Sequence, residues 1–418
     1  MQLSPLPLHA LPAQYDQQAA AWLVACTDGD AGALHALRDN HPRFCQLTDE
    51  QLRQLSLAQQ DIQEALLRFY CFKTWEELMG WVVEMLDKRS SLMQFEMAAN
   101  AIVSGNLEEL DALLSRYPEL VHMRSLRSHH AMLLHYTAAN GVEQYRQHTP
   151  ANITAIVKRL VKAGADVNAE ADLYGGGATT LGLAATSVWP SKAGVMAALL
   201  ETLLEAGAAI ESPRAAGNGQ LAVNGCLHNG RPEAADFLMR KGAGLDLEAA
   251  AGTGRLDVVQ AFFNKDGSLK DAGMQRQLEP GFTWACAYGH EAVVRFLLDQ
   301  GFDPATRVDE LYGLHWALLG AHANVIRLLL SRGAPLETRN AYGGTALGAA
   351  LWAVANGHEV NRWPETGTDY IAIIEILLQA GAVIEPGMLE WIAGENGISS
   401  DMKERLGMLM RRYMSRGE

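Results

Sequence analysis

An all-α helical solenoid is the fold class that this 418-residue sequence predicts, and two observations predict it. The first is a recurring phrase in which an apolar helical segment ends in Gly and a short exit, as in "LVKAGADVNA", "LLDQGFDPA" and "LLSRGAPLE". The second is composition, because 49% of the residues are apolar and their spacing within the units is helical. Repeated helical units bury a continuous core only by stacking on their neighbours, which produces a solenoid.

The glycine of this phrase marks the end of the second helix of each unit. The chain turns there into a left-handed conformation that Gly adopts at low cost. The successive separations are 43, 35, 59, 32 and 48 residues. The separation of 59 contains an extra, degenerate unit, "LEAAAGTGRLDVVQAFFNKDGSL", and those of 43 and 48 are single units with insertions. The glycines are Gly164, Gly207, Gly242, Gly301, Gly333 and Gly381.

Two of the units, "GFTWACAYGHEAVVRFLLDQGFDPA" and "GLHWALLGAHANVIRLLLSRGAPLETRNAYGGTAL", resemble ankyrin repeats, in which a pair of helices is followed by a hairpin-like finger. The resemblance covers residues 92–385 and implies about seven to eight units of a repeat whose period is about 33 residues. "CFKTWEEL" further resembles a stretch in the N-terminal helical part of many bacterial ankyrin-repeat proteins. The resemblance implies a fold and no settled biochemical activity.

Three regions are expected along the chain. Residues 1–91 form a helical N-terminal region, in which "AAAWLVACTDGDAGALHALRDNHPRF" predicts two amphipathic helices joined at Gly-Asp. Residues 92–385 form the repeat array with its short fingers. Residues 386–418 form a helical cap that shields the apolar face of the last repeat.

Charge and cysteine usage exclude several classes of protein. A net charge of −14 disfavours a nucleic-acid partner, which usually requires a basic stripe. The longest apolar stretch is interrupted by Glu201 and Glu205, so no membrane span is expected, and the N-terminus does not look like a signal peptide. Five cysteines without a C-x-x-C pair indicate reduced thiols and no zinc ribbon. We therefore expect a cytoplasmic protein.

Thirteen histidines raise the question of a metal site. His135 and His315 occupy the repeat motif, and His290 and His322 occupy its turn, where such side chains bond backbone groups. The dense segment "VHMRSLRSHHAMLLHYTAANGVEQYRQH" has no H-E-x-x-H spacing, and no G-x-S-x-G elbow occurs. We expect no catalytic residue, no metal and no cofactor.

An insertion interrupts the unit that begins "HYTAANGVEQYRQHTPAN" at residue 135. Equivalent insertions, "SVWPSKAG" and "GHEVNRWPETG", interrupt the next unit and the last one, so all three leave the same edge of the solenoid. They are either a binding edge or tolerated surface loops. We expect Tyr145 to pack near Trp189, and Arg146 to point to solvent or a bound anion. The candidate residues are Tyr145, Arg146, His148, Trp189, Arg362 and Trp363.

A second set of candidates lies on the inner helices, at the position that faces the groove of an ankyrin array. Trp284 and Trp316 are expected to form a stacked aromatic wall beside a hollow left by small residues in the preceding units. Tyr136 occupies the same position in an earlier unit. Glu248 stands where the motif has His, and its carboxylate needs either a partner or exposure at the groove lip.

Tyrosines at the finger tips complete the candidate set. They precede or lie within the Gly turns "DLYGG", "DELYG" and "RNAYGG", and exposed tyrosines on presented hairpins are common recognition residues. The three are Tyr174, Tyr312 and Tyr342.

Two functions remain open. The first is a non-catalytic scaffold that binds another protein through its groove, finger tips and insertion edge. The second is an ankyrin-fold enzyme, or a protein that binds a small molecule or metal, with a pocket near Glu248, Trp284 and Trp316 or near Tyr145 and Arg146. The irregular insertions favour the second, and the absence of a recognised catalytic spacing favours the first.

Overall fold

The computed structural model describes residues 2–211, 221–308, 311–356, 369–395 and 397–415. The chain divides into two compact units, unit 1 (residues 1–220) and unit 2 (residues 221–418), and each is described by itself. Both consist of short helices with a few two-residue strands, so the predicted all-α solenoid class is confirmed. The predicted regions do not coincide with the units, because residues 1–91 share unit 1 with the first repeats.

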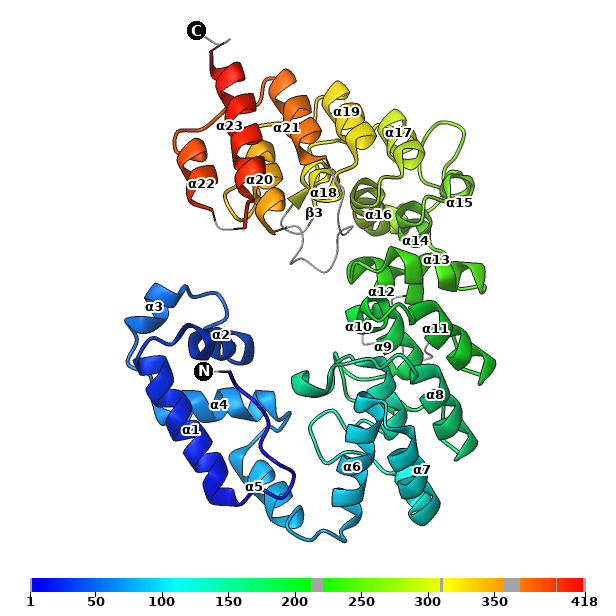
Figure 1. Ribbon diagram of the computed structural model, residues 1–418. Coiled ribbons are helices and arrows are strands. Elements are labelled where there is room, and N and C mark those ends of the chain that lie inside the picture. The colour runs from blue at the N-terminus through cyan, green and yellow to red at the C-terminus, as the bar shows by residue number, and fades with distance from the viewer. Residues whose placement is uncertain (1, 212–220, 309–310, 357–368, 396, 416–418) are drawn as a thin grey trace. The chain divides into compact units, whose positions relative to one another are not determined.

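Unit 1 begins with five helices that lie together (Figure 1, blue). Their core is built around Trp22, whose indole nitrogen donates to the carbonyl of Ala33 at 3.0 Å. Leu92 and Met93 of the first repeat belong to the same apolar cluster, so the N-terminal helices and the repeats share a core. The helices are α1 (Pro12–Thr27), α2 (Ala31–Asn40), α3 (Asp49–Arg53), α4 (Gln59–Phe69) and α5 (Trp75–Glu84).

The repeats of unit 1 follow as helix pairs. The first pair is α6 (Ser91–Ser104) with α7 (Leu107–Arg116), and a short 3-10 helix, η1 (Pro118–His122), continues it. In the next repeat the predicted inner helix is a fully buried 3-10 helix, η2 (Leu133–Ala138), which stops where Ala139 takes a φ of 49°. Its outer helix is α8 (Ile153–Lys162). The third repeat contains α9 (Thr180–Thr186) and α11 (Met196–Glu205).

The two described insertions carry secondary structure of their own. The insertion after η2 contains the 3-10 helix η3 (Gln144–Arg146), and the one after α9 contains the short helix α10 (Val188–Lys192). Ser187 joins them, because its hydroxyl donates to the carbonyl of Ala139 at 3.2 Å. The third insertion falls mostly on residues 357–368, which lie outside the described residues.

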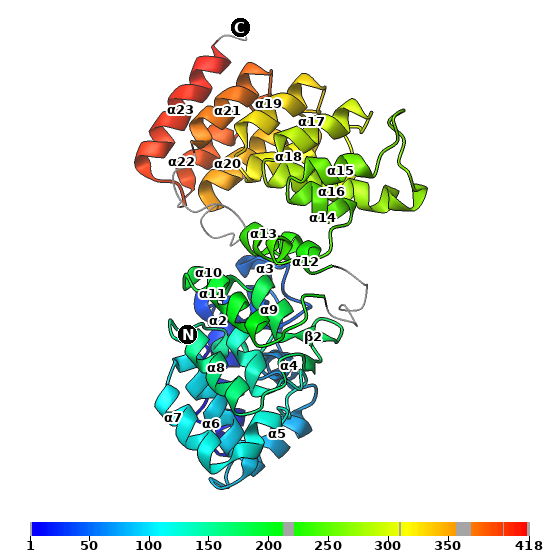
Figure 2. The same ribbon diagram turned by 90° about the vertical axis from the view of Figure 1, so that its right-hand side faces the viewer.

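Unit 2 contains the most regular part of the solenoid. Figure 2 shows its later helices in two rows, one of α16, α18, α20 and α22 and the other of α17, α19, α21 and α23. The first five helices of the unit are α12 (Ala222–His228), α13 (Pro232–Arg240), α14 (Leu247–Gly252), α15 (Leu256–Ala261) and α16 (Gln275–Ala287), with η4 (Ala272–Met274) before α16. They continue as α17 (Glu291–Asp299), α18 (Gly313–Leu319), α19 (Ala323–Ser331), α20 (Ala346–Asn356), α21 (Tyr370–Gln379), α22 (Met388–Gly394) and α23 (Ser400–Met414).

The glycine turns and fingers follow the sequence pattern. All six phrase glycines have a positive φ, from 83° at Gly333 to 103° at Gly164, so the predicted helix ends are confirmed. The pair α14 and α15 is the degenerate unit predicted within the separation of 59 residues. Two fingers contain antiparallel strand pairs, β1 (Glu170–Ala171) with β2 (Ala178–Thr179) and β3 (Arg307–Val308) with β4 (Leu311–Tyr312). Over the described ranges, no helix is both long and apolar enough to cross a membrane.

Candidate functional site

A pocket of about 650 Å³ lies on the inner-helix face of unit 2. Its walls come from three helices and one finger: Trp316 on α18, Trp352 on α20, Trp391 on α22 and Tyr342 on the finger at residues 340–344. We call it the aromatic pocket. Its described lining contains no Asp, Glu, Lys or Arg. His315 is the one imidazole in the lining, and burial lowers its pKa and so favours the neutral form. The site therefore suits an uncharged, apolar group.

The aromatic pocket has a buried floor and an exposed rim. Trp316 is only 9% exposed and forms part of the floor. Tyr342 is 78% exposed, Trp352 43% and Trp391 39%, so three large rings meet solvent around one opening. Large exposed aromatic side chains grouped in this way are typical of recognition surfaces.

The finger that presents Tyr342 is held by its own sequence, "RNAYGG". The side-chain oxygen of Asn340 accepts hydrogen bonds from the backbone nitrogens of Tyr342 and Gly344, both at 3.0 Å. Gly343 takes a φ of 80°, which a residue with a Cβ adopts only at a cost. Arg339 donates to the Gly343 carbonyl at 2.6 Å, so the tip is fixed on both sides. These hydrogen bonds fix the backbone of the finger that presents Tyr342.

Glu248 lies further along the same face, on α14. Its Oε1 accepts a hydrogen bond from the indole nitrogen of Trp284 at 3.1 Å and lies 2.5 Å from Nε2 of His228. The Glu248 side chain is 12% exposed, so it has both of the expected features, polar partners and partial exposure. The Trp284 ring in turn contacts those of His228 and Tyr288, with centroids 4.8 Å and 6.2 Å apart.

Trp284 and Trp316 do touch, but not as predicted. Their ring centroids are 5.5 Å apart and the planes meet at 66°, so the contact is edge-to-face and not stacked. The rings are 5% and 9% exposed, because the neighbouring inner helices pack around them. The aromatic pocket does not lie beside small residues such as Ala249, where the hollow was expected. The pocket opens on the other side of Trp316, toward α20 and α22.

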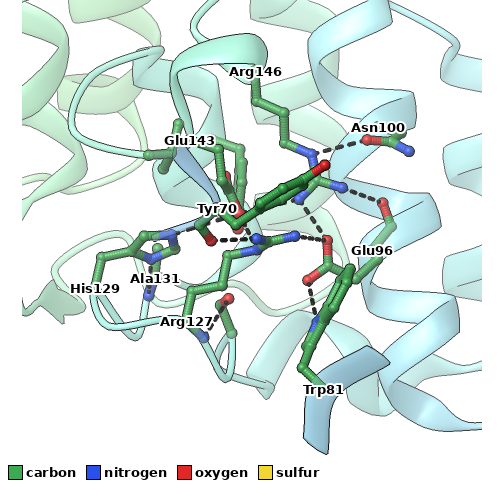
Figure 3. A network of polar contacts seen from close by, with 12 residues as sticks. Tyr70, Trp81, Glu96, Asn100, Arg127, His129, Ala131, Glu143 and Arg146 are labelled. Atoms are coloured by element: carbon green, nitrogen blue, oxygen red, sulfur yellow. Dashed lines mark hydrogen bonds and ion pairs between the residues drawn. The ribbon is translucent and has the colours of Figure 1, made fainter. Parts of the chain in front are cut away.

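In unit 1 the insertion contributes to a buried ion-pair network (Figure 3). Arg146 Nη1 lies 2.6 Å from Glu96 Oε2 and 3.3 Å from Glu143 Oε1. Its Nε donates to the side-chain oxygen of Asn100 at 2.9 Å. Arg127 pairs with Glu143 through Nε and lies 3.2 Å from Glu96 Oε2. All four charged side chains are at most 2% exposed.

Opposite charges keep this network ionised. Burial alone would raise the pKa of Glu96, but Arg127 and Arg146 outweigh it and hold that pKa below its ordinary value. Burial likewise opposes ionisation of Glu143, and the same two guanidinium groups lower its pKa. Burial would lower the pKa of Arg146, whereas Glu96 and Glu143 raise it. Two carboxylates and two guanidinium groups therefore leave the network neutral overall.

The expectation that Arg146 points to solvent or a bound anion is wrong, because its buried guanidinium forms an ion pair with Glu96, a residue of the preceding repeat. Tyr145 is also placed differently. Its ring lies 5.2 Å from that of Phe69 and 6.1 Å from that of Tyr70, and no ring contact with Trp189 is found in the described part of unit 1. The N-terminal helices lie beside this insertion, which the sequence did not predict, and the ring of Tyr145 packs against them.

The other candidates of unit 1 divide into buried and exposed side chains. Tyr136 is fully buried and does not face a groove, because its ring packs on Phe95 and its hydroxyl lies 3.4 Å from Glu143. His148 is exposed. Trp189 is half-buried, and the ammonium of Lys192 lies 5.5 Å from its ring centroid.

The finger tyrosines differ in exposure. Tyr174 is 68% exposed, and its hydroxyl donates to the side-chain oxygen of Asn140 at 2.7 Å. Tyr312 is half-buried against His315, with ring centroids 5.6 Å apart. Arg362 and Trp363 of the third insertion lie outside the described residues.

Three of the four motif histidines bond backbone groups as expected. Nε2 of His135 lies 3.0 Å from the carbonyl of Ala169, and burial lowers the pKa of this imidazole to about 4. His290 and His322 each lie 2.9 Å from a backbone carbonyl of the preceding repeat. Across the described residues, no group of three or more His, Cys, Asp or Glu side chains could hold a metal ion.

Comparison with known proteins identifies a repeat family within unit 2. A family model described as "Ankyrin repeats (3 copies)" matches residues 247–340 and 282–385. The chain is therefore an ankyrin repeat-containing protein, and the matched segment contains Glu248, Trp284, Trp316, Tyr342 and Trp352. Among solved structures, the human ASB11 ankyrin repeat domain is similar at 21% identity, covering 69% of this chain and 99% of that chain, with a TM-score of 0.35. No curated protein matches the sequence.

Sequence reasoning missed residues in both units. Trp352 lies one helical turn after Ala349, which occupies the groove-facing position of its inner helix. A pattern that includes the residue one turn later on each inner helix would predict Trp352. Trp391 belongs to the predicted C-terminal cap, for which the sequence predicts only that it shields the last repeat. Glu96 carries no local signal, because its partners Arg127 and Arg146 are 31 and 50 residues away along the chain.

Proposed function

We propose that this chain is a protein-recognition module whose binding site is the aromatic pocket of unit 2. The observation that carries the proposal is the exposure of Tyr342, Trp352 and Trp391 around one uncharged pocket. Ankyrin repeats typically bind proteins, and the family match includes the helices that form most of this pocket. A partner protein would cover the rim and insert an apolar side chain between the rings.

The energetic argument rests on the area that a partner would remove from water. A buried aromatic side chain accounts for about 150–250 Å², and each Å² of apolar surface contributes about 25 cal/mol. Truncating an aromatic residue at the centre of an interface often costs about 2 kcal/mol or more. Two rim tryptophans and one tyrosine therefore supply the kind of anchor that dominates binding.

A small molecule is the second candidate, because about 650 Å³ falls within the range of small-molecule sites. The exposed rim favours a protein instead. Small-molecule sites enclose most of their ligand, whereas the ring of Tyr342 projects from a finger and is mostly in solvent.

The flanking regions have separate roles in this proposal. Residues 92–385 form the repeat array, and residues 386–418 supply Trp391 to the pocket in addition to capping the last repeat. Residues 1–91 stabilise the first repeats through their shared core. Tyr174, His148 and Trp189 are individual candidate contacts for a partner on unit 1.

The test is to select peptides from a random library displayed on phage, using the full chain as the target. Synthetic copies are then titrated against the wild type and the double variant Trp352→Ala/Trp391→Ala. Met408→Ala is the matched control, because Met408 is 56% exposed in unit 2 and does not line the pocket.

The proposal predicts at least tenfold weaker binding by the double variant, unchanged binding by the control, and melting temperatures close to the wild type for both. It is overturned if the selected peptides bind the double variant as well as the wild type.

A further inference from the structure

Glu248 has bonding capacity that its neighbours do not use. Both of its contacts, to Trp284 and His228, are made by Oε1. No hydrogen bond or ion pair to Oε2 is found within the described residues, and the side chain is partly exposed. A carboxylate oxygen can accept more than one hydrogen bond, so Oε2 is able to accept one from a Lys or Arg side chain of a partner.

The carboxylate and the aromatic pocket are connected by successive inner helices. Glu248 bonds to Trp284 on α16, Trp284 contacts Trp316 on α18, and Trp316 lines the pocket with α20. The Glu248 carboxylate lies 3.1 Å from the Trp284 indole nitrogen, and the centroids of Trp284 and Trp316 are 5.5 Å apart, so Glu248 lies roughly 15 Å from the centre of the pocket. An extended peptide covers about 3.3–3.6 Å per residue, which makes this distance about four to five residues.

From this arrangement we infer that the partner segment is an extended peptide with two anchors, an apolar side chain for the aromatic pocket and a Lys or Arg for Glu248. The inference rests on the proposed function and specifies its ligand. Charge complementarity supports it, because the described pocket lining is uncharged while Glu248 is anionic and the chain carries a net charge of −14.

The experiment uses the peptides selected on the full chain. Each is titrated by fluorescence anisotropy against the wild type, Glu248→Gln and Glu279→Gln. Glutamine keeps the size of Glu248 and an oxygen for the Trp284 indole, so the fold is preserved while the charge is removed. Glu279→Gln removes the same charge from an exposed site on α16 and serves as the matched control. Each peptide is also made with its basic residue changed to Ala.

We expect a basic residue about four to five positions from the apolar anchor in the selected sequences. Glu248→Gln should weaken binding about fivefold, as for a partly exposed ion pair, while Glu279→Gln has no effect. The Ala peptides should bind the wild type and Glu248→Gln equally. Peptides that need Trp352 and Trp391 but ignore Glu248→Gln would overturn this inference and leave the proposed function standing. Peptides that need neither the tryptophans nor Glu248 would overturn both.

Discussion

Arg146 and Glu96 show what a buried charge requires of its surroundings. Removing one guanidinium from the network of unit 1 would leave two carboxylates in a fully buried site with Arg127 as the remaining counter-charge. Such a loss is costly, because the unpaired charge keeps its desolvation penalty. Removing one residue of each sign leaves a neutral pair and should cost much less.

The first prediction follows from this balance. Arg146→Met should lower the free energy of unfolding of unit 1 by about 3–5 kcal/mol, and the double variant Glu96→Gln/Arg146→Met should recover more than half of that loss. The measurement is native-state hydrogen exchange of peptides from α6 and η2. Arg159→Met is the control, because the pair between Arg159 and Asp111 is partly exposed, with side-chain exposures of 42% and 33%. Equal effects of Arg146→Met and Arg159→Met would contradict the account.

His135 gives a second prediction, for the dependence of stability on pH. Burial lowers its folded-state pKa to about 4, whereas an unfolded histidine titrates near about 6.5. Between these values the unfolded chain binds more protons, so stability falls as the pH drops from about 6.5 to about 4, by about 3 kcal/mol.

The check is urea unfolding of the wild type and His135→Gln across this pH range. His135→Gln should lose less stability on acidification than the wild type. His148→Gln, the matched exposed control, should lose as much stability as the wild type. Parallel curves for the wild type and His135→Gln would show that His135 does not supply this dependence.

At the scale of the element, the positions of helices and turns were predictable from the sequence and the roles of the insertions were not. The phrase glycines determine where outer helices end, because a positive φ is a local requirement. The partners of an inserted side chain depend instead on segments far along the chain. Tyr145 packs against Phe69, and Arg127 donates to the carbonyl of Tyr70, 57 residues away. The sequence therefore identified the insertion as unusual without indicating that it faces inward.

The third prediction concerns the first insertion. Replacing residues 142–151 by an Asn-Gly turn removes Glu143 and Arg146 together with the aromatic contact of Tyr145. We expect destabilisation of unit 1 and faster proteolysis within residues 1–91, because these residues lose packing that the insertion supplies.

Peptide binding by unit 2 should be unaffected by this replacement. Replacing residues 188–193 by the same turn is the control, and it should have a smaller effect, since Trp189 is only half-buried. An intact, protease-resistant unit 1 without residues 142–151 would show that the insertion is a bystander.

On the scale of the whole molecule, the two units use their unusual residues differently. In unit 1 the charges of Glu143 and Arg146 in the first insertion are buried, and Tyr145 packs, partly buried, against the N-terminal helices. In unit 2 the aromatics of the inner helices, one finger and the C-terminal helix pair remain partly exposed around one pocket. Our proposal therefore places recognition in unit 2, and internal packing accounts for the buried charges of the first insertion in unit 1.

The most direct measurement is fluorine NMR of the full chain labelled with 5-fluorotryptophan, which reports on all nine tryptophans. Resonances are assigned with single Trp→Phe variants, and a selected peptide is titrated in. The account predicts that the resonances of Trp316, Trp352 and Trp391 shift with the peptide concentration, while those of Trp22 and Trp81, buried in unit 1, do not. Shifts at Trp22 or Trp81 without any change at Trp352 and Trp391 would contradict it.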